Sequence, residues 1–232
     1  SGRLGNLLYK RFKSKHQVFN NGLKKRKYDI SNFNRIQKLL KNNLDLIINC
    51  SGNTNIENCE KNKLKLAKQV NSFRKFISLT HKKKIKFIQI STDHMYDNPN
   101  FNKSSNEKKK PIINNYYTKN KIALENIALK KNALILRTNF FSFTMKKHLV
   151  SNLLKNVKMH KFVNLAHDQY FSPLNIFTLV KILETIINQR KFFSGIYNLG
   201  SKKGMSKANF CLKILKGEKI KNFSYNLVKI ND

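Results

Sequence analysis

Short apolar runs alternate with longer amphipathic segments over the first 140 residues. Three runs are apolar almost throughout and predict buried strands, at residues 44–49 (LDLIIN), 85–91 (IKFIQIS) and 133–138 (ALILRT). The segments at 31–43, 60–80 and 117–131 have the spacing of helices, and Ser31 is the expected N-cap of the first. Strands separated by helices in this way predict a parallel sheet with helices on both faces.

The pattern is looser after residue 140. It predicts a helix over 145–158, a strand over 162–165, a helix over 174–189, a strand over 195–199 and a helix over 206–215. We therefore predict an α/β fold with a Rossmann-like, doubly wound parallel sheet in residues 1–140. Residues 141–232 form a smaller lobe, with strand exchange possible between the two parts.

Charge is the unusual feature of the composition. The 232 residues include 47 Lys and Arg against 12 Asp and Glu, a net charge of +35, which suggests a polyanion such as nucleic acid as a partner. However, 40 of the basic residues are Lys and 7 are Arg, and recognition of base edges depends mainly on Arg. With 33 Asn and 6 Ala, the excess of Lys is typical of a general compositional drift. A polyanion-binding protein stays as one alternative.

The cysteines and the apolar runs narrow the remaining classes. Cys50, Cys59 and Cys211 are isolated, without the spacing of a metal site or a disulfide framework. The longest apolar runs reach about six residues, whereas a membrane-spanning helix needs about 20. We expect a cytoplasmic protein that has no metal site and does not span a membrane.

The first candidate motif is Gly2-Arg-Leu-Gly5, which precedes the helix-like stretch LLYKRF. Glycines in a Rossmann turn let the backbone turn tightly and approach a pyrophosphate. The motif has two of the expected three glycines and no strand before it, so we expect the first strand to be missing upstream. Residues 17–19 (QVF) are the candidate second strand.

The second candidate motif combines a strand end with a helix. Ser91-Thr92-Asp93 follows the run IKFIQI, at the edge where open α/β sheets place their active sites. Tyr117 and Lys121 are four residues apart and therefore share one helical face. An ammonium beside a phenol favours the phenolate and is expected to lower the pKa of Tyr117.

These motifs resemble the extended short-chain dehydrogenase/reductases, and within them the dTDP-4-dehydrorhamnose reductase group. The resemblance runs through almost the whole chain in the family's order. Its main segments are Asp29-Ile30-Ser31, DLIINCSGNTNIENCE at 45–60, STDHMYD at 91–97, YTKNKIALE at 117–125, LILRTN at 134–139, HDQYFSP at 167–173 and GIYNLGS at 195–201.

The resemblance implies an NAD(P)-dependent oxidoreductase that reduces a 4-keto-6-deoxy sugar nucleotide in polysaccharide biosynthesis. It assigns catalysis to Thr92, Tyr117 and Lys121, and substrate binding to Asn53, Asp93, Asn139 and Phe140. The cofactor residues that it implies are Gly2, Leu4, Gly5, Asp29, Ile30, Cys50, Ser51, Gly52 and Lys121. It also makes residues 1–140 the NAD(P)-binding domain and residues 141–232 the substrate-binding lobe of a possible homodimer.

The cofactor and the reaction class leave alternatives open. No acidic residue follows the second-strand candidate, and Lys24, Lys25 and Arg26 suit a 2′-phosphate, so we expect NADP(H) in preference to NAD(H). An epimerase or dehydratase of the same superfamily is the first alternative. His94 follows Asp93 where dehydratases usually have a second acid, which favours reduction. A cofactor-binding regulatory subunit without activity is the other alternative on this fold.

Overall fold

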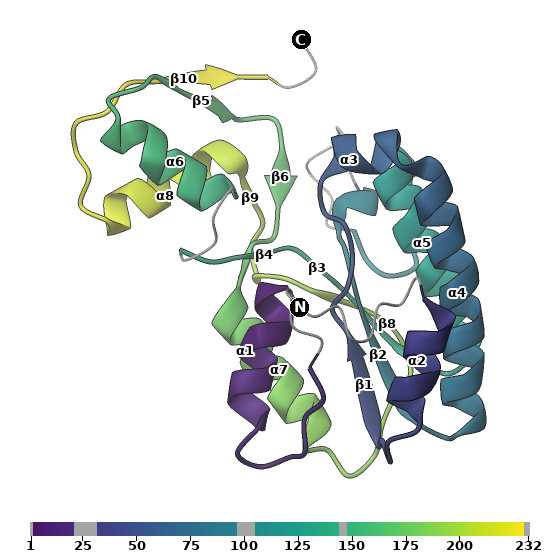
Figure 1. Ribbon diagram of the computed structural model, residues 1–232. Helices are drawn as coiled ribbons and strands as arrows, with labels where there is room; N and C mark the ends of the chain where they lie inside the picture. The colour runs from purple at the N-terminus through teal and green to yellow at the C-terminus, as the bar shows by residue number, and fades with distance from the viewer. Residues whose placement is uncertain (1, 21–31, 97–104, 144–147, 230–232) are drawn as a thin grey trace. The chain divides into compact units, whose positions relative to one another are not determined.

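The computed structural model describes residues 2–20, 32–96, 105–143 and 148–229. The chain forms two compact units (Figure 1). Unit 1 contains residues 1–96, 106–138 and 180–198, and unit 2 contains residues 97–105, 139–179 and 199–232. Residues 180–198 thus return to unit 1 from the second half of the chain.

A four-stranded sheet forms the centre of unit 1. Its strands are β1 (Leu46–Asn49), β2 (Lys86–Ser91), β3 (Leu134–Thr138) and β8 (Gly195–Leu199), in the order β1-β2-β3-β8. The pairs β1–β2 and β2–β3 are parallel, with Asn49 opposite Gln89 and Ser91 opposite Arg137. The carboxyl ends of these strands therefore lie at one edge, where loops can carry functional groups.

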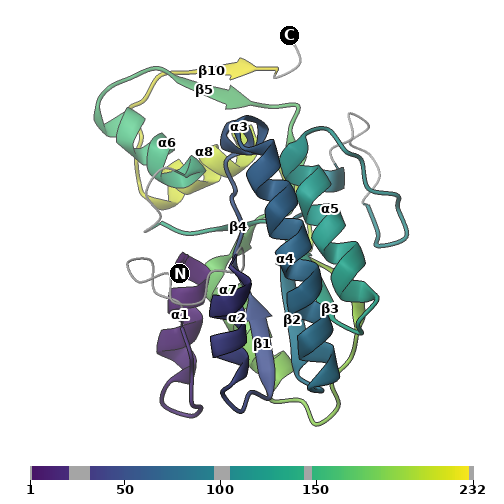
Figure 2. The ribbon, with the colours of Figure 1, turned by 45° about the vertical axis from the view of Figure 1, so that its right-hand side comes forward.

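Helices cover both faces of this sheet (Figures 1 and 2). One face carries α2 (Phe33–Leu40), α4 (Lys63–Lys82) and α5 (Tyr116–Leu129). The other carries α1 (Arg3–Phe12) and the part of α7 (Ile176–Ile187) that belongs to unit 1. The Arg11 guanidinium joins these last two helices, because its Nε and Nη2 donate to Glu184 Oε2 at 3.0 and 2.8 Å.

Aromatic side chains fill the core beneath α2, α4 and α5. Phe73 and Phe76 from α4 meet Phe87 from β2 edge to face, with ring centroids 5.9 and 5.7 Å from that of Phe87 and 6.4 Å from each other. All three rings are buried together with Ile36, Leu40, Ile77, Leu124 and Ile135. Burial of side chains of this size contributes about 1.5–3 kcal/mol each, so this cluster fixes α4 and α5 on the sheet.

The described part of unit 2 contains two helices, the first residues of α7 and three short strand pairs. Its helices are α6 (Leu149–Lys158) and α8 (Lys207–Gly217). The parallel pairs are β4 (Phe140–Phe141) with β7 (Leu174–Asn175), and β5 (Val163–Ala166) with β10 (Tyr225–Val228); β6 (Tyr170–Phe171) and β9 (Met205–Ser206) pair antiparallel. Phe210 from α8 packs edge to face on Phe141 and Phe171, with centroids 4.9 and 5.2 Å away.

The α/β fold with a parallel sheet is confirmed, as are the three predicted strands of residues 1–140. The helix predicted over 60–80 is two helices, α3 (Ile56–Lys61) and α4, separated by Asn62. The N-cap of α2 is Asn32, whose side chain accepts from the Arg35 N–H, while Ser31 lies outside the described residues. In the described chain no helix is long and apolar enough to cross a membrane.

The strand predicted at residues 17–19 is wrong, because these residues have no regular structure. A strand exists only where a neighbour supplies backbone partners, and within the described ranges β1 ends the sheet without a further strand beside it. Three apolar or neutral residues are too weak a pattern to form a strand alone.

Candidate active site

The end of β2 and the start of α5 carry the predicted catalytic residues. Thr92 directly follows β2, is 2% exposed, and its Oγ1 accepts a hydrogen bond from the His94 N–H at 3.2 Å. The 3₁₀ turn η1 (His94–Tyr96) comes next. This turn leaves the Thr92 hydroxyl close to Tyr117 of α5, and the hydroxyl acts to lower the pKa of that phenol.

A capping box holds the first turn of α5. The Asn115 side chain accepts from the Thr118 N–H at 2.9 Å, and the Asn115 N–H donates to the Thr118 hydroxyl at 3.3 Å. The Glu60 carboxylate from α3 accepts from the Tyr116 N–H at 2.7 Å, which adds an anion at the positive end of the helix. Because Tyr117 lies between the residues of this box, its backbone is fixed from both sides. The sequence motif gave Thr118 no such role.

Tyr117 is buried and its phenol is protonated at neutral pH. The side chain is 7% exposed, and the His94 ring contacts it edge on at 6.0 Å between centroids. Burial raises the pKa of Tyr117 to about 12, and the Thr92 hydroxyl, which favours the phenolate, opposes this shift. The expected lowering of this pKa is therefore wrong for the protein by itself, because desolvation outweighs the effect of Thr92 and the charge of Asp93 raises the pKa further.

Lys121 lies one turn further along α5 and points into the unit. Its ammonium donates to the carbonyl oxygen of Ile90 at 3.3 Å, and the residue is 7% exposed. Burial lowers the pKa of Lys121, and the Glu125 carboxylate opposes this shift. The Gln89 amide donates to the same carbonyl at 2.9 Å, so two buried donors meet at one strand end.

A polar chain leads from this carbonyl to the end of β1. The Asn49 Nδ2 donates to Gln89 Oε1 at 2.8 Å, and the Ser51 hydroxyl donates to Asn49 Oδ1 at 2.5 Å. Gly52 follows directly, and a Cβ at this position would lie 2.9 Å from Lys121 Nζ. A residue without a side chain is thus required for Lys121 to keep its place.

The carboxyl ends of β1, β2 and β3 carry groups suited to a bound ligand. Among the described residues, the hydroxyls of Ser91 and Thr138 are buried without a hydrogen-bond partner, at the carboxyl ends of neighbouring strands. Cys50 directly follows β1 and is half-buried. Burial raises the pKa of its thiol to about 12. Neutral donors, a cation and an open glycine therefore occur at one edge of the sheet.

The other predicted residues are more widely distributed. Gly2 is the N-cap of α1, Gly5 and the buried Leu4 are inside this helix, and neither glycine has a neighbour that excludes a side chain. Asn53 caps the following turn by accepting from the Asn55 N–H at 3.1 Å. The charge of Asp93 acts on Tyr117 and contributes to its raised pKa.

The remaining predicted residues belong to unit 2 or lie outside the described residues. Asn139 and Phe140 belong to unit 2, where the Asn139 carbonyl accepts from the Leu174 N–H at 3.0 Å. Asp29, Ile30 and the basic residues at 24–26 lie outside the described residues. Across the described ranges, no cluster of three His, Cys, Asp or Glu side chains could hold a metal ion.

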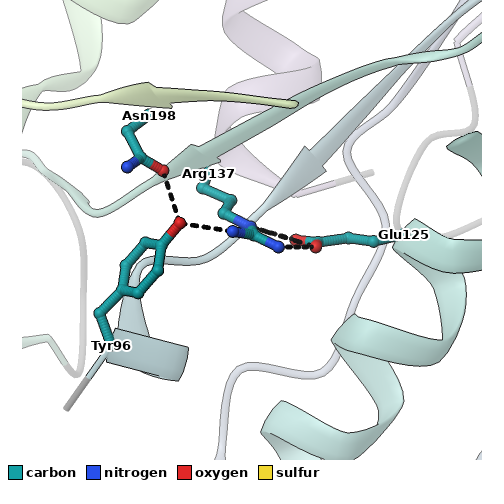
Figure 3. Close-up of polar contacts among 4 residues, drawn as sticks. All are labelled: Tyr96, Glu125, Arg137 and Asn198. Carbon is teal, nitrogen blue, oxygen red and sulfur yellow. Dashed lines mark hydrogen bonds and ion pairs between the residues drawn. The ribbon is translucent and has the colours of Figure 1, made fainter. Parts of the chain in front are cut away.

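The sequence motifs missed a buried ion pair between α5 and β3 (Figure 3). Glu125 on α5 and Arg137 on β3 are 1% and 3% exposed, and Arg137 Nη2 lies 2.6 Å from Glu125 Oε2. Arg137 also donates to the hydroxyl of Tyr96, which in turn donates to Asn198 Oδ1 at 3.2 Å. The signal was a charged residue in each of two segments with apolar patterns.

A model of the RmlD substrate-binding domain family matches residues 1–230. The chain belongs to this family. The resemblance that its motifs indicated is thereby confirmed. Among curated protein sequences, none matches this RmlD-family chain.

Solved structures share the fold of the RmlD-family chain. A dTDP-4-dehydrorhamnose reductase from Clostridium acetobutylicum superposes with a TM-score of 0.87 at 20% identity, covering 100% of this chain and 82% of that one. The corresponding Bacillus anthracis reductase, in complex with NADP, gives 0.84 at 21% identity, with 98% and 81% covered. A hypothetical dTDP-4-dehydrorhamnose reductase from Sulfolobus tokodaii gives 0.81 at 25% identity, with 97% and 82% covered.

Proposed function

We propose that this protein is an NAD(P)H-dependent reductase of a 4-keto-6-deoxy sugar nucleotide, of the dTDP-4-dehydrorhamnose type. The observation that carries the proposal is the placement of three side chains: the buried Thr92 hydroxyl directly after β2, the buried Tyr117 phenol that it acts on, and Lys121 one helical turn away. A protonated phenol beside a second hydroxyl is suited to bind a carbonyl oxygen and to donate a proton to it. Family membership and the named relatives support this reaction.

The residues of the site divide the work of carbonyl reduction. Tyr117 donates its proton to the C4 oxygen, and Thr92 holds that oxygen in place through its hydroxyl. Lys121 orients the cofactor ribose and, with its positive charge, stabilises the phenolate that remains on Tyr117. A bound nicotinamide supplies the hydride. Because the phenol has a pKa of about 12, it is fully protonated, as an acid must be, before the reaction.

The strand ends of unit 1 and the start of α1 have groups that fit a nicotinamide nucleotide. Gly52 provides space that a Cβ would fill, and the unpaired hydroxyls of Ser91 and Thr138 need partners. Gly2 precedes the first turn of α1, whose free N–H groups suit a pyrophosphate. We propose that unit 1 binds the cofactor and that unit 2, with Asn139 and Phe140, binds the sugar nucleotide.

Turnover by wild type and Tyr117→Phe tests the proposal. With dTDP-4-dehydrorhamnose as substrate, the oxidation of NADPH is followed by its absorbance, and Tyr117→Phe is expected to reduce kcat by about 10²–10⁴-fold, the usual contribution of a general acid. Tyr116→Phe is the matched control, because this ring is half-buried and its backbone, not its hydroxyl, makes the contact with Glu60. Wild-type turnover that survives in Tyr117→Phe would refute the mechanism.

The alternatives give other outcomes in the same experiment. Loss of water or inversion at a carbon, detected by NMR of the products without net oxidation of NADPH, would identify a dehydratase or epimerase. Tight NADPH binding with no turnover of several keto-sugar nucleotides would identify a regulatory subunit. Binding to DNA or RNA that weakens steeply with salt would identify a polyanion-binding protein. A higher kcat/KM with NADPH than with NADH would support the proposed preference for NADP(H).

A further inference from the structure

Three charged side chains are buried in the described chain, and all belong to one arrangement. They are Lys121, Glu125 and Arg137. Lys121 and Glu125 lie four residues apart on α5, on the same face as Tyr117, so this face presents a phenol, an ammonium and a carboxylate at successive turns. Burying charges is costly unless their geometry compensates for lost hydration, so this arrangement needs an explanation beyond packing.

Arg137, on β3, binds both oxygens of the Glu125 carboxylate. Its Nε lies 3.2 and 3.1 Å from the two carboxylate oxygens, and its Nη2 donates to Oε2 at 2.6 Å. A fork of this kind fixes the direction as well as the position of the carboxylate. Glu125 is thus held against β3 instead of turning toward the Lys121 ammonium and pairing with it directly.

Tyr96 closes the other side of the guanidinium. Its hydroxyl accepts from Arg137 Nη1, and its ring lies 5.3 Å from the guanidinium carbon (Figure 3). Asn198 on β8 accepts from Tyr96, and its backbone N–H donates to Glu107 Oε1 at 2.7 Å. These contacts anchor Arg137 to three separate segments of unit 1, all outside α5.

The groups that face Lys121 make Glu125 the relevant anion. The charges that act on Lys121 are those of Glu125 on α5, Cys50 after β1 and Cys59 in α3. Burial raises the pKa of both thiols, that of Cys50 to about 12, so they are neutral at working pH. Tyr117, the remaining titratable group on this face, is neutral as well because its pKa is about 12.

We propose that Glu125, held in place by Arg137, is a positioning residue whose carboxylate on the same face of α5 keeps the buried ammonium of Lys121 charged. The proposal rests on the proposed function for its consequence in catalysis, but not for the electrostatic effect itself. Arg137 has a second part in it, because its hydrogen bonds to both carboxylate oxygens keep Glu125 from turning toward Lys121. The Lys121 ammonium therefore remains available to a ligand and does not collapse onto Glu125.

The test compares two variants that break the same ion pair from opposite sides. In Glu125→Gln the carboxylate charge is lost, so the pH midpoint at which Lys121 loses its proton should move down. In Arg137→Met the carboxylate is released from the guanidinium and can turn toward Lys121, so the midpoint should move up. The midpoint is measured on the intact protein without substrate or cofactor, by NMR of ¹³Cε-labelled lysine, with the Lys121 signal assigned by its absence in Lys121→Arg.

A structural clamp would behave differently from a positioning residue. Both variants would then lose stability, and the Lys121 midpoint would stay in place or move in the same direction in both, which would overturn the proposal. If Arg137→Met does not fold, Glu125→Asp replaces it as the second variant, because it keeps the carboxylate charge. The Lys121 midpoint in Glu125→Asp should stay near that of wild type. A downward shift equal to that in Glu125→Gln would also overturn the proposal. Glu57→Gln is the control, because its pair with Lys61 is exposed.

Catalysis supplies the second measurement and separates the two proposals. The kcat of a working reductase should decline as pH rises, because Lys121 loses its proton and no longer assists the proton transfer. In Glu125→Gln this decline should begin at a lower pH than in wild type, so that kcat at the alkaline end is lower than that of wild type by about tenfold or more. If wild type turns over no keto-sugar nucleotide, the proposed function fails while the NMR midpoints still decide the role of Glu125. If the NMR midpoints of the two variants do not diverge, the inference fails while the reductase assay stands.

Discussion

Adding one methyl group at Gly52 should displace the Lys121 ammonium without damaging the fold. A Cβ at Gly52 would lie 2.9 Å from Lys121 Nζ and 3.5 Å from its Cε, whereas ordinary contacts begin at 3.4 Å. The ammonium must therefore move by about 0.5 Å, while its hydrogen bond to the Ile90 carbonyl, at 3.3 Å, is already long. We expect Gly52→Ala to break this bond.

The size of the effect follows from the charge on the donor. A hydrogen bond to a charged group contributes about 1.5–3 kcal/mol, which corresponds to about ten- to a hundredfold in rate if the loss falls on the transition state. Stability should fall only moderately, because Gly52 is exposed and replacing such a glycine by alanine stabilises by about 0.4–1 kcal/mol through the unfolded chain, which offsets part of the lost hydrogen bond. The variant should thus be folded and slow.

NADPH oxidation and urea unfolding measure the two quantities on the same samples. Gly217→Ala is the matched control, since a Cβ at Gly217 has no neighbour within 4 Å and the residue ends α8 in unit 2. It should keep both the kcat and the KM of wild type. Unchanged kcat and unchanged KM for NADPH in a folded Gly52→Ala protein would show that the position of Lys121 against Gly52 has no part in turnover.

Two further predictions concern the cap at the start of α5 and the buried thiol of Cys211. Asn115→Ala removes the cap beside the catalytic phenol, and it should lower both kcat and, by about 1 kcal/mol in urea unfolding, the stability. Asn32→Ala removes a cap on α2 and should cost a similar amount of stability but leave kcat intact. Equal kcat in the two variants would contradict a role for the cap in placing Tyr117. Burial raises the pKa of the Cys211 thiol from its ordinary 9.0 to about 11, so the unfolded chain ionises first and stability is lost as pH rises from about 9 to 11. Cys211→Ala should flatten this part of the stability–pH curve, measured by urea unfolding, by on the order of 2 kcal/mol, and an unaltered slope would exclude the thiol as its source.

The sequence predicted the sheet well because apolar runs report burial directly. The runs before Asn49 and before Ser91 became β1 and β2, since a strand covered on both faces must be apolar throughout. The run at residues 17–19 failed because a strand depends on its neighbours in space, which a local pattern does not contain. The two-residue strands of unit 2 and β10 were missed for the same reason.

The site was predictable to the extent that it follows chain order and helical spacing. The position of Thr92 at a strand end and the four-residue step from Tyr117 to Lys121 both follow from local rules. The protonation of Tyr117 did not follow, because burial of the phenol depends on the tertiary packing around it. Nor did the pairing of Glu125 with Arg137, which joins a helix to a strand across the fold.

The location of Arg137 distinguishes two kinds of positive charge in this protein. Of 47 basic residues, Lys121 and Arg137 are the two that are buried in the described chain. A surface lysine can be gained or lost with little consequence, whereas a lysine at 137 could not span both oxygens of Glu125. Position 137 therefore has an arginine in spite of the excess of lysine, because a planar guanidinium that binds both oxygens is required there. In a chain this rich in lysine, an interior arginine is a better marker of function than the whole of its surface charge.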